Sequence, residues 1–163
     1  MSHSDGSDTL WPQRAAYADP PYPGYSRYYP EREEVDHADL IAQLCEFDGW
    51  ALHTYSNALR DLLPLCPPRA RVAAWVKPFC SFKPGISPAY AWEPVIFMPV
   101  RGAGFPTPRD WLAESITLKK GLVGAKPPAV VEWVFSLLGL RDGDQLEDLF
   151  PGTGVVGVTW AAR

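Results

Sequence analysis

Two short segments of the sequence, one near each end of the chain, carry residues that could do chemistry together. The first is Asp19-Pro20-Pro21-Tyr22. A planar exocyclic amine is a poor nucleophile because its lone pair is delocalised into the ring, and acceptors that bind both of its N–H groups localise that pair, most strongly in the transition state. The Asp19 carboxylate and the Pro20 carbonyl are two such acceptors, and proline fixes the backbone that aims the carbonyl. Tyr22 offers a ring face on which an extruded base can stack. The same four residues also suit an ordinary proline-rich turn.

The second segment runs from Asp148 to Gly154, with the sequence DLFPGTG. It reads as an apolar strand, a turn with two glycines and the start of a helix, where the backbone can approach a ligand closely and a carboxylate is favoured. The segment lacks the Lys-Ser/Thr ending of a phosphate-binding loop, which disfavours hydrolysis of nucleoside triphosphates. Gly157 completes G-x-G-x-x-G, but no further strand with an acidic residue follows, so a dinucleotide site is poorly supported. Alone, the segment also fits a tight strand-to-helix turn.

The elements that must hold these segments alternate between strands and helices. We predict strands at 15–18, 50–54, 72–76, 92–100 and 145–150, the fourth being broken by Pro94. Asp36 is predicted to cap a helix with the apolar face Leu40, Ile41, Leu44 and Phe47, which Gly49 ends. Further helices are predicted at 57–63, at 127–138 and at the carboxyl end, with a long loop at 77–89 and mostly irregular chain at 101–125. This alternation predicts an α/β sheet, whose ligands lie at the carboxyl ends of the strands.

Length and composition limit the number of domains and the class of protein. A chain of 163 residues with 47% apolar and 21% charged residues is typical of one globular domain. We expect residues 1–11 to form a disordered tail and residues 12–163 to form that domain. The polar amino end resembles no signal peptide and no apolar run is long enough to span a membrane, so a cytoplasmic protein is expected.

Charge is distributed unevenly along the chain. The net charge is −4, but residues 69–126 hold nine basic and three acidic residues. This basic stretch is the part of the chain that could face a polyanion, although a solvated basic face explains it equally well. Cys45, Cys66 and Cys80 are odd in number and have neither disulfide nor zinc-site spacing, so we expect packed thiols and no metal. His37 and His53 are interpreted as cap or core residues.

Taken together and in this order, the motifs resemble a known family. The DPPY segment at 19–22, Lys126-Pro127 before a helix and DLFPGTG at 148–154 are similar to the catalytic, tenth and first motifs of the S-adenosylmethionine-dependent amino-methyltransferases of DNA, in the permuted form of bacteria and phages. The segment 91–95 is similar to the strand before the tenth motif. The resemblance implies a Rossmann-like sheet with helices on both faces, truncated at its edge after the cofactor motif. It implies transfer of a methyl group to N6 of adenine, since DPPY rather than SPPY favours adenine, in a bacterial cell or a phage-infected host.

The resemblance also assigns roles to residues. The residues implied for catalysis are Asp19, Pro20, Pro21 and Tyr22, and those implied for binding S-adenosylmethionine are Lys126, Pro127, Asp148, Phe150, Gly152, Thr153 and Gly154. Direct attack by the amine needs no covalent nucleophile, which disfavours C5-cytosine methylation. The residues expected to contact DNA by stacking and phosphate binding, with weak sequence preference, are Tyr25, Tyr28, Lys77, Lys83, Lys119 and Lys120.

The chain also departs from the family's pattern. Only residues 101–125 are left for a target-recognition region, and the strand that normally binds the cofactor ribose does not follow Gly154. A homodimer or a partner subunit is expected to complete the sheet edge. The alternative is a methyltransferase fold without activity that binds nucleic acid or a partner. The enzymatic interpretation requires that Asp19 and the glycine turn lie on the same side of the molecule, and that no internal ion pair holds the Asp19 carboxylate.

Overall fold

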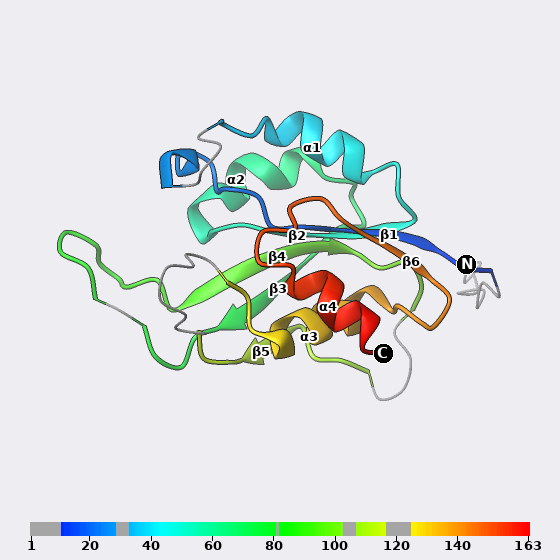
Figure 1. Cartoon of the computed structure of the whole chain (residues 1–163). Coiled ribbons are helices and arrows are strands. Elements are labelled where there is room, and N and C mark those ends of the chain that lie inside the picture. The colour runs from blue at the N-terminus through cyan, green and yellow to red at the C-terminus, as the bar shows by residue number, and fades with distance from the viewer. Residues whose placement is uncertain (1–10, 29–32, 81, 103–106, 117–124) are drawn as a thin grey trace, which may run out of the picture.

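A mixed six-stranded sheet forms the middle layer of the computed structural model, which describes residues 11–28, 33–80, 82–102, 107–116 and 125–163 (Figure 1). The strands are β1 (Arg14–Ala18), β2 (Gly49–His53), β3 (Arg71–Val76), β4 (Trp92–Met98), β5 (Trp111–Ala113) and β6 (Gln145–Asp148). The α-helices are α1 (His37–Leu44), α2 (Leu59–Leu62), α3 (Pro128–Leu138) and α4 (Val155–Ala161). Short 3-10 helices are η1 (Ser26–Tyr28), η2 (Ser56–Ala58) and η3 (Leu63–Leu65). The α/β class is confirmed, whereas nearly all of the predicted tail lies outside the described residues.

The strand order places four strand ends at one edge. The order is β5-β3-β4-β2-β1-β6, and β4 runs antiparallel to both of its neighbours while the other pairs are parallel. Since β2 and β3 both oppose β4, β3 runs in the same direction as β1. The carboxyl ends of β1, β2, β3 and β6 therefore meet at the same edge of the sheet, the usual ligand side of such folds.

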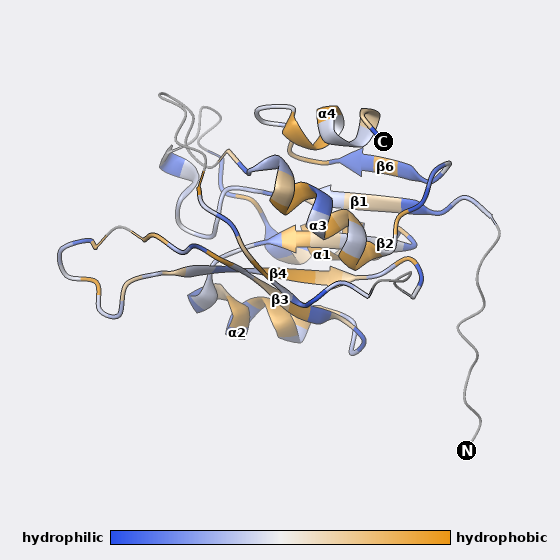
Figure 2. Ribbon diagram, turned by 90° about the horizontal axis from the view of Figure 1, so that it is seen from below, coloured by the Kyte–Doolittle hydropathy of each residue, from blue (hydrophilic) through white to orange (hydrophobic). Residues whose placement is uncertain are grey.

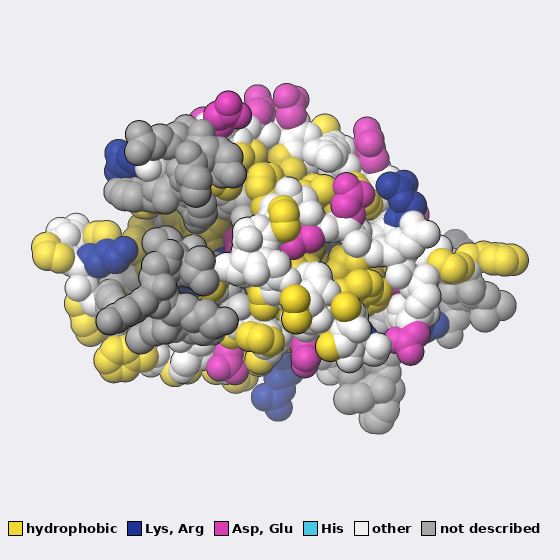
Figure 3. Space-filling model, in the orientation of Figure 1, with side chains coloured by type: hydrophobic (Ala, Val, Ile, Leu, Met, Phe, Trp, Pro, Cys, Tyr) yellow, Lys and Arg dark blue, Asp and Glu magenta, His cyan; other side chains and the backbone are white. Residues whose placement is uncertain are grey.

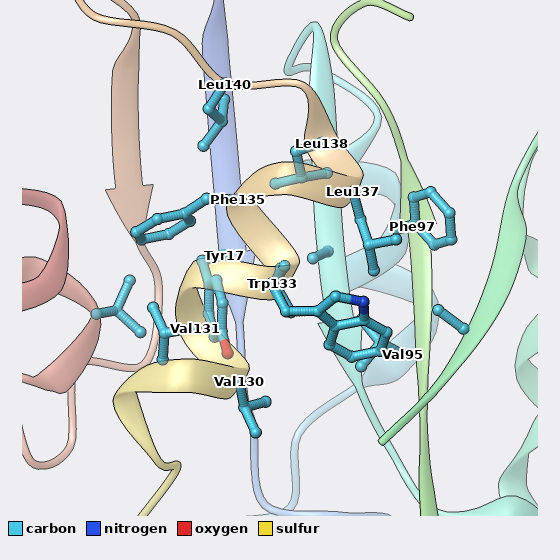
Figure 4. Close-up of a cluster of buried hydrophobic side chains, with 14 of the residues drawn as sticks. Tyr17, Val95, Phe97, Val130, Val131, Trp133, Phe135, Leu137, Leu138 and Leu140 are labelled. Atoms are coloured by element: carbon cyan, nitrogen blue, oxygen red, sulfur yellow. The ribbon is translucent and has the colours of Figure 1, made fainter. Parts of the chain in front are cut away.

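Helices cover both faces of the sheet, as predicted. The helices α1 and α2 pack on one face around Ile41, Leu44 and Trp50, and α3 packs on the other with α4 against its flank. Figure 4 shows the second cluster, in which Tyr17 from β1 and Val95 from β4 face α3. The inner strand β4 is hydrophobic, whereas β6, at the edge of the described sheet, is mainly hydrophilic (Figure 2). Within the described residues, no helix is long and apolar enough to cross a membrane.

The first helix begins as predicted but ends earlier. The Asp36 carboxylate accepts hydrogen bonds from the N–H groups of Ala38, at 2.9 Å, and Asp39, at 3.1 Å, which makes it the N-cap. The helix ends at Leu44, so Phe47 lies beyond it. Gly49 does not end the helix; it is the first residue of β2. A Cβ at Gly49 would lie 2.6 Å from the carbonyl oxygen of Met98, so the glycine is required for close strand approach.

One other prediction about a strand was wrong. Pro94 does not break its strand, because it lies opposite Thr54, just after the end of β2. Its carbonyl accepts a hydrogen bond from the Thr54 N–H at 3.2 Å, and the N–H that proline lacks would face the same side, where the ladder with β2 stops. The segment 101–125, predicted to be mostly irregular, contains the short strand β5, which pairs with β3. The three residues of β5 are too few to show the alternation of apolar and polar side chains that predicts a strand.

A buried ion pair fixes the opposite edge of the sheet. Two Arg101 nitrogens lie 2.5 and 2.9 Å from the Asp144 carboxylate oxygens, which also accept hydrogen bonds from the N–H groups of Gln13 and Arg141. Arg101 also donates to the Gly139 carbonyl, at the αL residue that ends α3. Burial alone would raise the pKa of Asp144, but these donors hold it at about 2. The pair ties the chain before β1 to the ends of β4 and α3.

We expect Asp144→Asn to lower the free energy of unfolding by about 3 kcal/mol at neutral pH, because it leaves the buried guanidinium without a carboxylate. The pKa of Asp144 is about 2 when folded and about 4 when unfolded, so its stabilisation is present above about pH 4 and is lost as pH falls toward 2. Urea titrations at several pH values measure both effects. The exposed Asp142→Asn is the control, and equal stability of the two variants would contradict the prediction.

Candidate active site

The two motifs meet at the carboxyl edge of the sheet. Asp19 directly follows the buried strand β1, and Asp148 ends β6, where its partner in β1 is Tyr17. The pairing continues past β6, because the Leu149 N–H donates to the Tyr17 carbonyl at 3.0 Å. Burial, and secondly the charge of Asp19, raise the pKa of Asp148, although a hydrogen bond from the Phe150 N–H opposes this. Asp19 and the glycine turn, residues 151–154, thus follow neighbouring strands, as the enzymatic interpretation of the sequence requires.

The second requirement is not met, because Asp19 is held in an internal ion pair. The Lys126 ammonium lies 3.0 Å from Asp19 Oδ2 and 2.9 Å from Glu93 Oε1. Lys126 and Glu93 are buried, whereas a fifth of the Asp19 side chain is exposed. Burial alone would lower the pKa of Lys126, but the two carboxylates outweigh it and raise that pKa. Lys126 was predicted to contact a cofactor; the structure places its ammonium between two carboxylates.

Glu93 is the centre of the cluster, and the sequence analysis missed it. Its carboxylate contacts Lys126, the Lys77 ammonium at 3.0 Å, the Tyr22 hydroxyl, which donates to it, and His53 Nδ1 at 3.4 Å. Burial alone would raise the pKa of Glu93, yet Lys126 first, then His53 and Lys77, hold it well below the usual range. A signal was present in the sequence, because Glu93 is the single charged residue in the apolar run of β4. A buried charge must have partners.

A chain of hydrogen-bonding groups extends this cluster into the core. His53 is fully buried at the end of β2, and its Nε2 forms a hydrogen bond of 2.7 Å with the Tyr17 hydroxyl. Burial, and then the charges of Asp19 and Glu93, raise the pKa of Tyr17 well above its usual value. His53 was interpreted as a cap or core residue; it is a core residue that also borders the site. His37, the other histidine, begins α1 and bonds the Val35 carbonyl at 2.9 Å.

Asp19, His53 and Glu93 bring possible metal-donor atoms within 4.8 Å of one another. The Lys126 ammonium, however, already contacts two of the three groups. A divalent ion there would have to overcome repulsion from this buried cation. The arrangement therefore fits a fixed ammonium better than a metal.

Three tyrosine rings form a cluster that joins the site through the hydrogen bond of Tyr22 to Glu93. The ring of Tyr22 stacks on that of Tyr55 with centroids 5.9 Å apart, and Tyr25 meets Tyr55 edge-on at 5.6 Å. Tyr25 is exposed, and Tyr28 ends η1 beside it. Among the lysines expected to contact DNA, Lys83 is exposed, whereas Lys77 binds Glu93 and lies 4.6 Å from the centre of the Trp75 ring. Lys119 and Lys120 lie outside the described residues.

The glycine turn leaves room above the edge of the sheet. Gly152 and Gly154 have φ of 44° and 77°, and the Gly154 N–H donates to the Pro151 carbonyl at 2.6 Å. A Cβ at Gly154 would meet no atom within 4 Å, so the turn borders open space. Thr153 is exposed, while Phe150 is partly buried against the α1 and α2 side of the core. Pro127, also implied in cofactor binding, is buried and caps α3.

The cysteines lie away from this chemistry. Burial, and secondly Cys45, raise the pKa of the Cys66 thiol to about 11, and its sulfur donates to the Leu62 carbonyl. A protonated, packed thiol is a poor nucleophile. This agrees with the expectation that Cys66 is a packed residue.

Comparison with known proteins shows a similar fold in a solved structure. The structure is similar to the crystal structure of the M1.HpyAVI–SAM complex, with a TM-score of 0.64 and 14% identity, over 93% of this chain and 78% of that chain. No family model matches the sequence. No curated protein matches it either. The chain therefore shares the α/β fold of that protein, a mixed sheet with helices on both faces.

We expect Glu93→Gln and Lys126→Met each to destabilise the fold by about 3 kcal/mol, because each leaves a buried charge without its partner. The double variant should lose less than the sum, with a coupling energy of about 1–3 kcal/mol. Since folding lowers the pKa of Glu93, its stabilisation is present at neutral pH and lost as pH falls below about 4. Denaturant unfolding of the four proteins provides the test, with the exposed Glu147→Gln as control. Additive losses would contradict the shared contact.

Proposed function

We propose that this chain transfers a methyl group from S-adenosylmethionine to the exocyclic N6 amine of adenine in DNA, with little sequence specificity of its own. The observation that carries the proposal is the placement of two predicted motifs on adjacent parallel strands. Asp19 follows β1 and the turn 151–154 follows β6, at the edge where ligands of such sheets bind. The similarity of the fold to the M1.HpyAVI–SAM complex also supports this proposal.

Asp19 and Pro20 would hold the amine. Among the described residues, nothing bonds Asp19 Oδ1 or the Pro20 carbonyl, so the site retains two acceptors for the two N–H groups. Tyr22 would stack on the base, with its own ring already supported by Tyr55. As nitrogen gains its new bond to carbon, it releases a proton, which the Asp19 carboxylate is placed to accept. Positioning and charge placement are the main demands of this step.

The residues assigned to the cofactor fit a ligand of this kind. Gly152 and Gly154 adopt positive φ in the turn that follows Asp148, and the Asp148 carboxylate would bind the amino group of an amino acid moiety. The Lys126 ammonium is held by Asp19 and Glu93, so its part in binding the cofactor would be to position Asp19. Bound S-adenosylmethionine would supply a methyl group on a positively charged sulfur, which leaves as a neutral thioether. Phe150, Thr153 and Pro127 complete the set of residues proposed to surround it.

The Lys126 ion pair favours a second candidate function. A lysine that stays on Asp19 would weaken its carboxylate as an acceptor, as expected of a methyltransferase fold that binds nucleic acid or a partner without catalysis. In the enzymatic proposal, Lys126 contacts Oδ2 while Oδ1 accepts the amine, and Glu93 holds the lysine in place. The homodimer, or a partner subunit on β6, stays a prediction in both cases.

Labelled methyl transfer to DNA tests the enzymatic proposal. The wild-type protein should incorporate label from S-adenosylmethionine, and digestion to nucleosides should identify N6-methyladenine by mass. Asp19→Ala should reduce the rate by on the order of a hundredfold or more, since it removes one acceptor of the amine. Exposed Asp61→Asn serves as the control, with circular dichroism to show that both variants fold.

Three outcomes discriminate between the candidates. Equal incorporation by Asp19→Ala and the wild type would refute the catalytic assignment. Binding of DNA without binding of S-adenosylmethionine, measured by calorimetry, would support the inactive fold. Label on cytosine rather than adenine would retain the methyltransferase and overturn its base specificity.

A further inference from the structure

The connection between β3 and β4 carries exposed aromatic rings at the same edge of the sheet as the candidate active site. Phe79 and Phe82 are 83% and 87% exposed, and Ile86 is also exposed. Both ribbon views show this loop projecting beyond the sheet (Figures 1 and 2). In the space-filling view, hydrophobic side chains gather at the projecting tip with a basic side chain beside them (Figure 3). Exposed rings on a projecting loop indicate an interaction surface.

The base of the loop is fixed to the site. The Lys77 N–H donates to the Ala91 carbonyl at 2.8 Å, and the Lys77 ammonium binds Glu93, which also contacts Lys126. On the returning half, the Tyr90 hydroxyl accepts a hydrogen bond from the Asn57 side chain at 2.8 Å. These contacts hold both ends of the loop against the domain and leave its tip outside. Half of this loop, about seven residues, spans at most roughly 25 Å when extended, which exceeds the width of about 12 Å of the major groove of duplex DNA.

The composition of the loop indicates a partner that offers flat apolar faces and negative charge. Residues 77–91 contain two lysines and no acidic residue, and Lys83 is exposed next to Phe82. Stacked bases and phosphates offer these two features together. A duplex that presents an adenine to Asp19 would also lie against a loop that begins at Lys77.

The proposed reaction requires the target base to leave the stack, and this loop would support that step. The N6 amine of adenine in a duplex belongs to a paired and stacked base, so the base must leave the stack to reach Asp19, at a cost of a few kcal/mol. Apolar side chains that enter between base steps stabilise such openings. We propose that Phe79 and Phe82 enter duplex DNA beside the target adenine and keep that base outside the stack, while Lys83 binds a neighbouring phosphate. This inference rests on the proposed function.

Fluorescence of 2-aminopurine, placed at adenine positions of a short duplex, reports unstacking directly. Wild-type protein should increase the fluorescence, and the double variant Phe79→Ala/Phe82→Ala should abolish the increase. Phe79→Leu/Phe82→Leu keeps an apolar wedge and should restore most of it. Trp11→Ala, which removes a 78% exposed ring before β1, is the matched control and should behave as wild type.

Methyl transfer supplies the second arm. The double alanine variant should lose at least about tenfold in rate on a fully paired duplex, which corresponds to about 1.4 kcal/mol of the cost of extrusion, and less than about threefold on single-stranded DNA. Equal losses on both substrates, or unchanged fluorescence and duplex rate, would overturn the wedge. So would sedimentation showing that the rings instead join two copies of the chain. Wild-type protein that unstacks 2-aminopurine but methylates no DNA would refute the proposed function and keep the wedge.

Discussion

One buried ammonium group organises the candidate site. Lys126 contacts Asp19 after β1 and Glu93 in β4, and it stands just before α3. Burying a lysine is costly unless carboxylates surround it, and here two carboxylates raise its pKa despite burial. Removing any member leaves an uncompensated charge in the interior. The ion pairs therefore fix the end of β1 relative to the beginnings of β4 and α3, and the chemistry of Asp19 depends on that placement.

The same network sets the electrostatic character of the edge. Asp19, Glu93 and Asp148 carry three carboxylates, and Lys77 and Lys126 carry two ammonium groups. The group as a whole thus favours a ligand with positive charge at this edge, as a sulfonium has. Glu93 is buried and contacts both lysines, whereas Asp19 is partly exposed and, among the described residues, has no hydrogen bond at Oδ1. Pairing on one oxygen orients the other.

Local patterns in the sequence predicted the elements well where local physics decides them. The strand before Asp19, the Asp36 cap and the helix closed by Gly139 all depend on neighbouring residues and were confirmed within one or two positions. Pro94 and β5 depend on which strands lie beside them, and periodicity carries no such information. The cluster around Glu93 was missed for the same reason, because its partners come from four separate segments of the chain.

Topology explains why distant segments act together. Since β4 alone runs against the other strands, the chain segments that follow β1, β3 and β6 leave the sheet at a common edge. These segments are the one that begins with Asp19, the loop that carries Phe79 and Phe82, and the glycine turn. The tip of the loop between β3 and β4 lies outside the two cores on the faces of the sheet, whereas Leu149 and Phe150, which follow β6, pack against one of them. The length of that loop can therefore vary independently of the cores, whereas Asp19 is constrained by Lys126, which binds it directly.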